Sequence, residues 1–303
     1  MKIKTFKILS LAFALTIIAC SSPQTESELV DQVPEEESEI IQDGSNQIDD
    51  VFYQVPTPNE LFAVLKNSNT PYNKEILNDV SNLKNYTSKG IKGLNFGVYA
   101  ADLAYVSSLG HIEDASKIFE TIRNLSKDLE IENALDEVIY KRIQSNLESS
   151  NADSLFYLSN DVYYNAYSYL DQNDRGDVLG MIVVGGWIEG LNIILNLEPY
   201  KEGSEVVQRI ADQKLTLENL LVFTSKINDE DLNLVISELS AIDEVFNSVS
   251  SDDEAENELT TTTGEDGVAM FGGGASLVLS EDQFNQLKNI VQELRSSIIE
   301  GAL

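Results

Sequence analysis

Apolar residues recur at helical spacing through most of the chain between about residues 51 and 250. In one stretch they follow one another at intervals of three or four residues: Leu232, Val235, Leu239, Ile242 and Val245. An α-helix places residues at this spacing on one face, whereas a half-buried strand needs strict alternation. The pattern therefore predicts an all-α fold, a single multi-helix domain of roughly nine or ten packed helices.

Capping residues and apolar stripes set the expected helix bounds. Thr57 with Glu60, and Ser280 with Gln283, have the spacing of a capping box, which opens a helix. The two most apolar segments, 88–108 and 177–197, are expected to lie at the centre, because a helix that is apolar on most faces must be buried. The helices are predicted at residues 57–65, 73–83, 88–108, 111–129, 132–147, 153–170, 177–197, 205–227, 229–249 and 280–298.

The N-terminus has the arrangement of a secretory signal. Three lysines (Lys2, Lys4 and Lys7) precede an apolar run of 11 residues, 8–18, and Ala19 then precedes Cys20. Eleven apolar residues are too few to span a hydrocarbon layer of ~30 Å. The segment is therefore expected to be a signal peptide rather than a transmembrane anchor.

The stretch that ends at Cys20 resembles the lipobox of bacterial lipoproteins. The resemblance implies that residues 1–19 are removed and that the Cys20 thiol is acylated with chains such as palmitate. Ser21 after the cysteine implies sorting to the outer membrane, with the periplasmic or surface-facing orientation left open. The composition and the segments around Asp102 and Trp187 are similar to uncharacterised all-helical lipoproteins of the Bacteroidota. Cys20 is the only cysteine, so its acylation leaves no thiol for a disulfide or a nucleophile.

The charge of the chain limits its partners. It carries 20 Lys and Arg against 51 Asp and Glu, and loss of the three N-terminal lysines leaves 17 minus 51, or −34. Nucleic-acid binding requires cations that neutralise phosphates, so no nucleic-acid partner is expected. The lipid on Cys20, rather than the protein surface, is expected to hold the membrane. An envelope protein remains a possible partner.

Two acidic segments lack an apolar stripe. Residues 21–50 contain ten acidic residues and no lysine or arginine, and residues 251–274 combine acids, a four-threonine run and three consecutive glycines. Such segments cannot bury enough apolar surface to fold. We therefore expect a lipidated, disordered tether over 20–50 and a mobile loop at about 251–274 within a helical domain of residues 51–303.

Asp102 and Glu189 are carboxylates within otherwise apolar helical segments. A buried carboxylate must be paired, hydrogen-bonded or protonated. One hypothesis places the two face to face in a ligand pocket. The favoured alternative is a structural network in which each carboxylate meets a cation or a hydroxyl. The candidate pocket residues are Tyr99, Asp102, Tyr105, Trp187 and Glu189, and the candidate cationic partners are Lys92, Arg209 and Lys214.

Other motifs carry little chemistry. Residues 171–177 begin like a calcium loop, but Arg175 and Ile182 stand where an EF-hand needs ligands, so a turn between helices is expected. His111 is the only histidine and lies at a predicted helix start. We expect no metal, no cofactor and no catalytic residue. The favoured function is a non-enzymatic binding or assembly subunit of the envelope. The alternative is a ligand-binding or hydrolytic protein that uses the pocket around Asp102 and Glu189.

Overall fold

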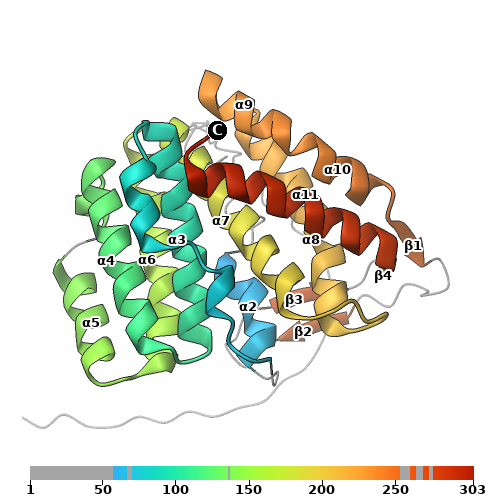
Figure 1. Ribbon diagram of the computed structural model, residues 1–303, viewed down its shortest axis with the longest axis horizontal. Coiled ribbons are helices and arrows are strands. Elements are labelled where there is room, and N and C mark those ends of the chain that lie inside the picture. Colours follow the sequence, from blue (N-terminus) through green and yellow to red (C-terminus); the bar gives the residue numbers. More distant parts are fainter. Residues whose placement is uncertain (1–56, 67–69, 136, 253–259, 264–268, 273–275) are drawn as a thin grey trace, which may run out of the picture. The chain divides into compact units, whose positions relative to one another are not determined.

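The computed structural model describes residues 57–66, 70–135, 137–252, 260–263, 269–272 and 276–303, and it is predominantly helical (Figure 1). The all-α fold class is confirmed. The predicted signal peptide, Cys20 and the tether lie outside the described residues. The α-helices are α2 (Pro58–Lys66), α3 (Lys89–Ser108), α4 (Ile112–Asp128), α5 (Glu137–Glu148), α6 (Ala152–Gln172), α7 (Gly176–Leu197), α8 (Glu205–Thr224), α9 (Glu230–Glu238), α10 (Ser240–Asn247) and α11 (Glu281–Glu300).

Helices α3 and α7 form the centre of the domain, as predicted, and make its most extensive helix–helix contact. Glycines bring the two backbones together. A Cβ atom on Gly97 would lie 2.1 Å from the carbonyl oxygen of Ile182, and one on Gly185 would lie 2.0 Å from that of Leu94. Any side chain at these positions would push the helices apart, so the two helices form a closely packed pair.

Helix α7 is long and apolar enough to cross a membrane by length and composition. Its apolar window is completely buried inside the domain, as expected for the core helix of a soluble protein. The sequence-based prediction of a buried helix at this position is confirmed.

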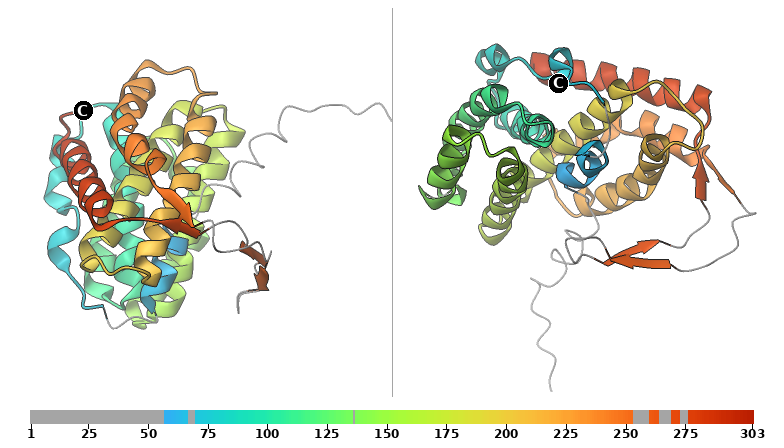
Figure 2. Two further views of the ribbon diagram at one scale, coloured as in Figure 1. Left: turned by 90° about the vertical axis from the view of Figure 1, so that its right-hand side faces the viewer. Right: turned by 90° about the horizontal axis from the view of Figure 1, so that it is seen from below.

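The remaining helices pack around the central pair. Helices α2, α4 and α6 contact α3, α5 packs on α6, and α8 and α11 contact α7. Figure 2 shows α4, α5 and α6 gathered at one side of α3, and α8, α9 and α10 at the other side of the domain. The C-terminal helix α11 lies across α7 (Figure 1). It docks through the predicted apolar face, since Phe284, Leu287, Val291 and Leu294 are buried.

Side-chain caps start several helices where they were expected. The Ser88 side chain accepts from the amide of Ile91 at the start of α3, and Ser204 accepts from Val207 at the start of α8. At α11 the Ser280 and Gln283 side chains form the predicted capping box. These caps satisfy amides that have no partner within the helix, which fixes the helix start.

Three predicted helices are wrong in detail. In place of the helix predicted at 73–83, the chain forms two short 3₁₀ helices, η1 (Lys74–Ile76) and η2 (Val80–Asn85). The side chains of Asn73 and Asp79 each accept a hydrogen bond from the backbone amide two residues ahead, so each begins a new short helix. The helix predicted at 229–249 is broken into α9 and α10 at Leu239. Bonds of the i to i+3 type at this junction tighten the chain there. Similarly, the helix predicted at 132–147 begins as the 3₁₀ helix η3 (Glu132–Ala134) before α5.

The segment predicted as an irregular loop contains strands. Strand β1 (Ser250–Asp252) pairs antiparallel with β4 (Ser276–Val278), and β2 (Thr260–Thr263) pairs antiparallel with β3 (Ala269–Gly272). The four-threonine run, whose β-branched residues favour strands, forms β2. The sequence analysis missed these pairs. The predicted mobility of this segment stays a prediction.

Candidate functional site

The two isolated carboxylates lie deep between the central helices. Asp102 is on α3 and Glu189 is on α7, and both are 0% exposed. Glu189 lies near enough for its negative charge to act on the Asp102 carboxyl. The ligand pocket hypothesised between the two side chains stays a prediction.

Arg295 of α11 neutralises Glu189. Its Nε donates to Glu189 Oε2 at 2.8 Å, and its Nη2 donates to Oε1 at 2.9 Å, which is a bidentate ion pair. The same Nη2 also donates to the carbonyl oxygen of Ile76 at 2.8 Å. Arg295 therefore joins three parts of the chain, namely α11, α7 and the segment of η1. The cationic partners that the sequence suggested are wrong, because none of them holds Glu189; Lys92, for example, pairs with Asp128.

Asp102 lacks a comparable partner. Its Oδ2 accepts from the backbone amide of Asn78 at 3.1 Å, whereas its Oδ1 has no hydrogen-bond donor among the described residues. Burial raises the pKa of Asp102 well above its ordinary value, and the negative charge of Glu189 raises it further. The positive charge of Arg295 acts in the opposite direction. Burial and charge thus favour the neutral form of this carboxyl group.

Amides and tyrosines extend the buried network. Asn78 Nδ2 donates to the Tyr86 hydroxyl at 2.9 Å and to Asn95 Oδ1 at 3.2 Å. Asn95 Nδ2 donates to the carbonyl oxygen of Ile298 at 2.9 Å, which is a polar link between α3 and α11. Each interaction satisfies a buried polar group and fixes how the helices sit against each other.

The other predicted pocket residues face different partners. The Tyr99 hydroxyl donates to the carbonyl oxygen of Asp79 at 3.0 Å, and the Tyr105 hydroxyl accepts from the amide of Asn73 at 3.0 Å. The Trp187 indole donates to Gln213 Oε1 on α8 at 3.1 Å. All five predicted pocket residues are at most 4% exposed. In this conformation a ligand in solution has no direct access to them.

Arg295 is the residue of this cluster that the sequence analysis missed. It lies beside Leu294 and four residues after Val291, at the edge of the buried stripe of α11. An arginine in such a stripe is a signal for a buried partner, because arginine is rarely buried unless it is paired. Its partner lies 106 residues away, so no local pattern could identify Glu189.

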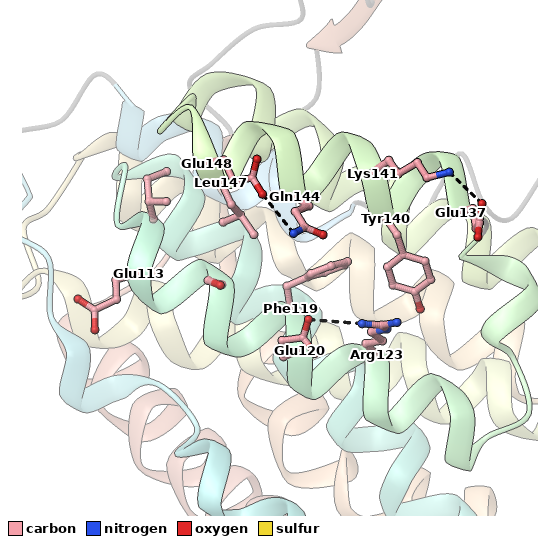
Figure 3. A pocket seen from close by; sticks show the side chains of 12 residues that line it. Glu113, Phe119, Glu120, Arg123, Glu137, Tyr140, Lys141, Gln144, Leu147 and Glu148 are labelled. Carbon is pink, nitrogen blue, oxygen red and sulfur yellow. Dashed lines mark hydrogen bonds and ion pairs between the residues drawn. The ribbon is translucent and has the colours of Figure 1, made fainter.

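The described surface is hollowed between α4 and α5. The cleft has a volume of about 590 Å³ (Figure 3). The rings of Phe119 and Tyr140 meet at 5.6 Å in its interior, and the Arg123 guanidinium lies 5.1 Å from the centre of the Tyr140 ring. The full set of lining residues is Ile112, Glu113, Ser116, Phe119, Glu120, Arg123, Glu137, Tyr140, Lys141, Gln144, Leu147 and Glu148.

The lining of this cleft is acidic at its rim. Four glutamates stand against Arg123 and Lys141, which gives a formal charge of 2 minus 4, or −2. The side chains of Glu113 and Glu137 are both 86% exposed. Figure 3 shows Lys141 paired with Glu137, and Glu120 paired with Arg123. Such exposed pairs are weak and can exchange for other partners.

His111 is part of a packing contact. It occupies the position before α4, and its ring stacks on Tyr72 with the ring centres 3.5 Å apart. The Tyr72 hydroxyl donates to Asp114 Oδ2 at 2.6 Å, and Lys74 pairs with the same carboxylate. The segment 171–177 forms the expected turn, since α6 ends at Gln172 and α7 begins at Gly176. Among the residues that the structure describes, no group of three or more His, Cys, Asp or Glu could hold a metal ion.

Comparisons of this chain with protein-family models, with curated proteins and with solved structures found no match in any of the three. The function proposed below is therefore inferred from the sequence and from the geometry described above.

Proposed function

We propose that the protein is a lipid-anchored subunit of the outer membrane, and that its helical domain binds or assembles with an envelope partner without catalysing a reaction. The anchor is supported by Cys20, the only cysteine, which directly follows a charged and then apolar N-terminal segment. Two or three acyl chains make membrane attachment effectively permanent, since each buried methylene contributes about 0.8 kcal/mol.

The absence of catalysis is supported by the state of the two carboxylates in the core. Glu189 is neutralised by a bidentate arginine, and both Glu189 and Asp102 are 0% exposed. A general acid or base must reach its substrate at hydrogen-bonding distance. These carboxylates link helices instead. Ligand binding or hydrolysis around Asp102 and Glu189 remains the second candidate, and it requires a conformation that opens the cluster.

We assign the binding role to the cleft between α4 and α5. Its interior is aromatic and its rim carries a net charge of −2, and the chain as a whole is strongly acidic. These features suit a basic amphipathic segment of a partner protein, which would place apolar residues against the partly exposed Tyr140 and Leu147 and cations near the glutamates. Complementary charge at a rim speeds association and selects among partners.

The anchor is tested by metabolic labelling with a clickable fatty acid. The wild-type protein should be labelled and Cys20→Ala should not, with equal expression verified by immunoblot. Equal labelling of the two proteins would overturn the lipid anchor. It would leave the binding proposal intact, because the cleft lies in the helical domain.

The cleft is tested with synthetic probes, a Lys/Leu amphipathic peptide and a Glu/Leu peptide of the same length. We expect the basic peptide to bind the full-length chain and the acidic peptide not to bind. Glu137→Lys at the rim should weaken binding of the basic peptide. Glu230→Lys on α9 makes the same change in net charge and is the matched control. Equal weakening by both variants would show that only the overall charge attracts the peptide, and would overturn the cleft assignment.

A further inference from the structure

We propose that Asp102 and Glu189 share one proton while α11 is docked, and that α11 undocks with release of this proton. The cluster would then act as a proton-linked latch on the C-terminal helix. This inference is independent of the proposed binding function, because it concerns the buried side of α11 rather than the cleft between α4 and α5.

The charges of the buried cluster balance only if one carboxyl group is protonated. Two carboxylates and one guanidinium would leave one uncompensated negative charge at a site that is 0% exposed at both carboxylates. Burying an unpaired charge is so costly that the group neutralises instead. Both oxygens of Glu189 already accept from Arg295, so Glu189 is the charged member. Asp102 is the member that must carry the proton.

Within the described part of the chain, the hydrogen bonds of the cluster also leave one oxygen of Asp102 unsatisfied. Asp102 Oδ1 has no donor among the described residues, although it is fully buried. Glu189 lies near enough for its negative charge to act on Asp102. A proton on Asp102 would turn this carboxyl from an acceptor into a hydrogen-bond donor and would remove the repulsion between the two groups. Two ionised carboxylates at the same place would instead repel one another.

Several titratable groups lie around Asp102. They include Glu189 of α7, Arg295 of α11 and a set of tyrosines from α3 and the segment that precedes it. Burial raises the pKa of each of these tyrosines, so none of them adds a charge at neutral pH. Arg295 thus provides the positive charge that acts on both carboxylates. The tyrosines are Tyr72, Tyr86, Tyr99 and Tyr105.

Helix α11 is the element expected to move. Helices α3 and α7 cannot separate easily, because their backbones touch at Gly97 and Gly185. Helix α11 packs against α7 and α10, and the chain connects it to α10 through the strand-containing segment between Asn247 and Glu281. Its departure removes Arg295 and admits water to both carboxylates. Undocking would also expose its apolar face, which includes Phe284, Leu287, Val291, Leu294 and Ile298.

The sign of the pH dependence follows from the raised pKa of Asp102. Because the pKa of Asp102 is higher in the docked state, this group stabilises the docked state most at pH values below its ordinary pKa of 3.8. The stabilisation is lost as the pH rises toward the docked-state pKa. One released proton corresponds to about a tenfold increase in the opening equilibrium per pH unit over that window. Opening should become independent of pH above it.

The test is hydrogen exchange of the full-length chain in detergent, followed from weakly acidic to alkaline pH and corrected for intrinsic exchange rates. In the wild type, opening of peptides from 281–300 should increase about tenfold per pH unit and then level off. Asp102→Asn keeps the shape of the neutral carboxyl and should abolish this dependence with α11 still docked. Asp161→Asn removes a carboxylate of α6 that pairs with Arg142, away from the cluster, and is the matched control.

The proposal is overturned if α11 opens in the wild type without this pH dependence, if Asp102→Asn retains the dependence, or if residues 70–86 open in place of α11. Infrared spectroscopy of wild-type chains labelled with ¹³C-aspartate gives a second measurement that needs no variant. A protonated aspartate should persist at pH values well above the ordinary pKa of 3.8 and disappear on unfolding. Its absence from the folded protein would also overturn the proposal.

Discussion

The buried cluster at Arg295 and the cleft at Arg123 use the same kinds of side chain in opposite ways. Each contains an arginine, carboxylates and a tyrosine. In the cluster the arginine binds Glu189 through two bonds of 2.8 and 2.9 Å, whereas in the cleft Arg123 lies 3.7 Å from Glu120 and rests on the Tyr140 ring. The Arg295 guanidinium is therefore held by one fixed partner in the buried cluster, whereas the Arg123 guanidinium in the cleft can exchange its partner.

The comparison teaches that burial, rather than residue type, decides whether charges hold the fold or meet a partner. Removing one partner of a buried pair leaves an uncompensated charge at a cost of about 3–5 kcal/mol. An exposed pair between neighbouring turns contributes only about 0.3–0.5 kcal/mol. Identical substitutions in the two regions should therefore give very different results.

The largest difference is expected for arginine. Arg295→Met should lower the free energy of unfolding by about 3–5 kcal/mol, because Glu189 loses its cation in the core. Arg123→Met in the cleft should change it by less than about 1 kcal/mol. Denaturant unfolding followed by circular dichroism measures both. Similar losses in the two variants would refute the distinction between the regions.

The next effect tests the packing that holds the cluster in place. Gly185→Ala would place a Cβ atom 2.0 Å from the carbonyl oxygen of Leu94 and force α3 and α7 apart. We expect a loss of about 1–3 kcal/mol or more, since overpacked cores are destabilised by this amount. At the neighbouring Gly186 the nearest atom to a new Cβ is 3.4 Å away, so Gly186→Ala should be milder. Equal thermal stability of these two variants would argue against a closely packed α3–α7 pair.

A smaller effect separates the two carboxylates. Glu189→Gln removes the anion that Arg295 binds and should cost about 1.5–3 kcal/mol, less than Arg295→Met, because the Asp102 carboxyl can then ionise and compensate Arg295. Asp102→Asn should cost less at neutral pH, because it replaces a carboxyl that already favours its neutral form. Thermal unfolding at neutral pH ranks the two. The reverse order would indicate that Asp102 carries the charge.

The smallest effect is expected at the rim of the cleft. Lys141→Ala removes an exposed pair with Glu137, whose nitrogen and oxygen atoms are 2.9 Å apart. We expect a loss of about 0.3–0.5 kcal/mol, which falls further at high salt. Denaturant unfolding at low and high salt detects this dependence. A loss above about 1 kcal/mol would mean that the cleft contributes to the fold more than its exposure suggests.

Local signals predicted most of the helices but not their mutual register. The Ser280 capping box marks a helix start that the structure confirms, and the helices predicted at 88–108 and 205–227 have side-chain caps from Ser88 and Ser204. Residues 73–83 were predicted wrongly because the side chains of Asn73 and Asp79 compete with the helix for backbone amides.

The candidate site was predictable only in part. Asp102 and Glu189 were recognisable because each is an isolated carboxylate in an apolar helix, and such a group requires a partner. The choice of Arg295 over Lys92, Arg209 or Lys214 depends on how α11 lies across α7. That arrangement arises from packing between helices far apart in the sequence, which spacing along the chain does not encode.

The separation of Glu189 from Arg295 also has a consequence for how the chain is made. Synthesis proceeds from the N-terminus, so Glu189 of α7 is made 106 residues before its cation. A nascent or prematurely terminated chain can collapse around α3 and α7, but it keeps an unneutralised carboxylate at its centre. Loss of as few as the last nine residues, 295–303, would have the same result. The ion pair thus makes synthesis of α11 a condition for a stable core, and chains that end before Arg295 should be preferred substrates for proteases.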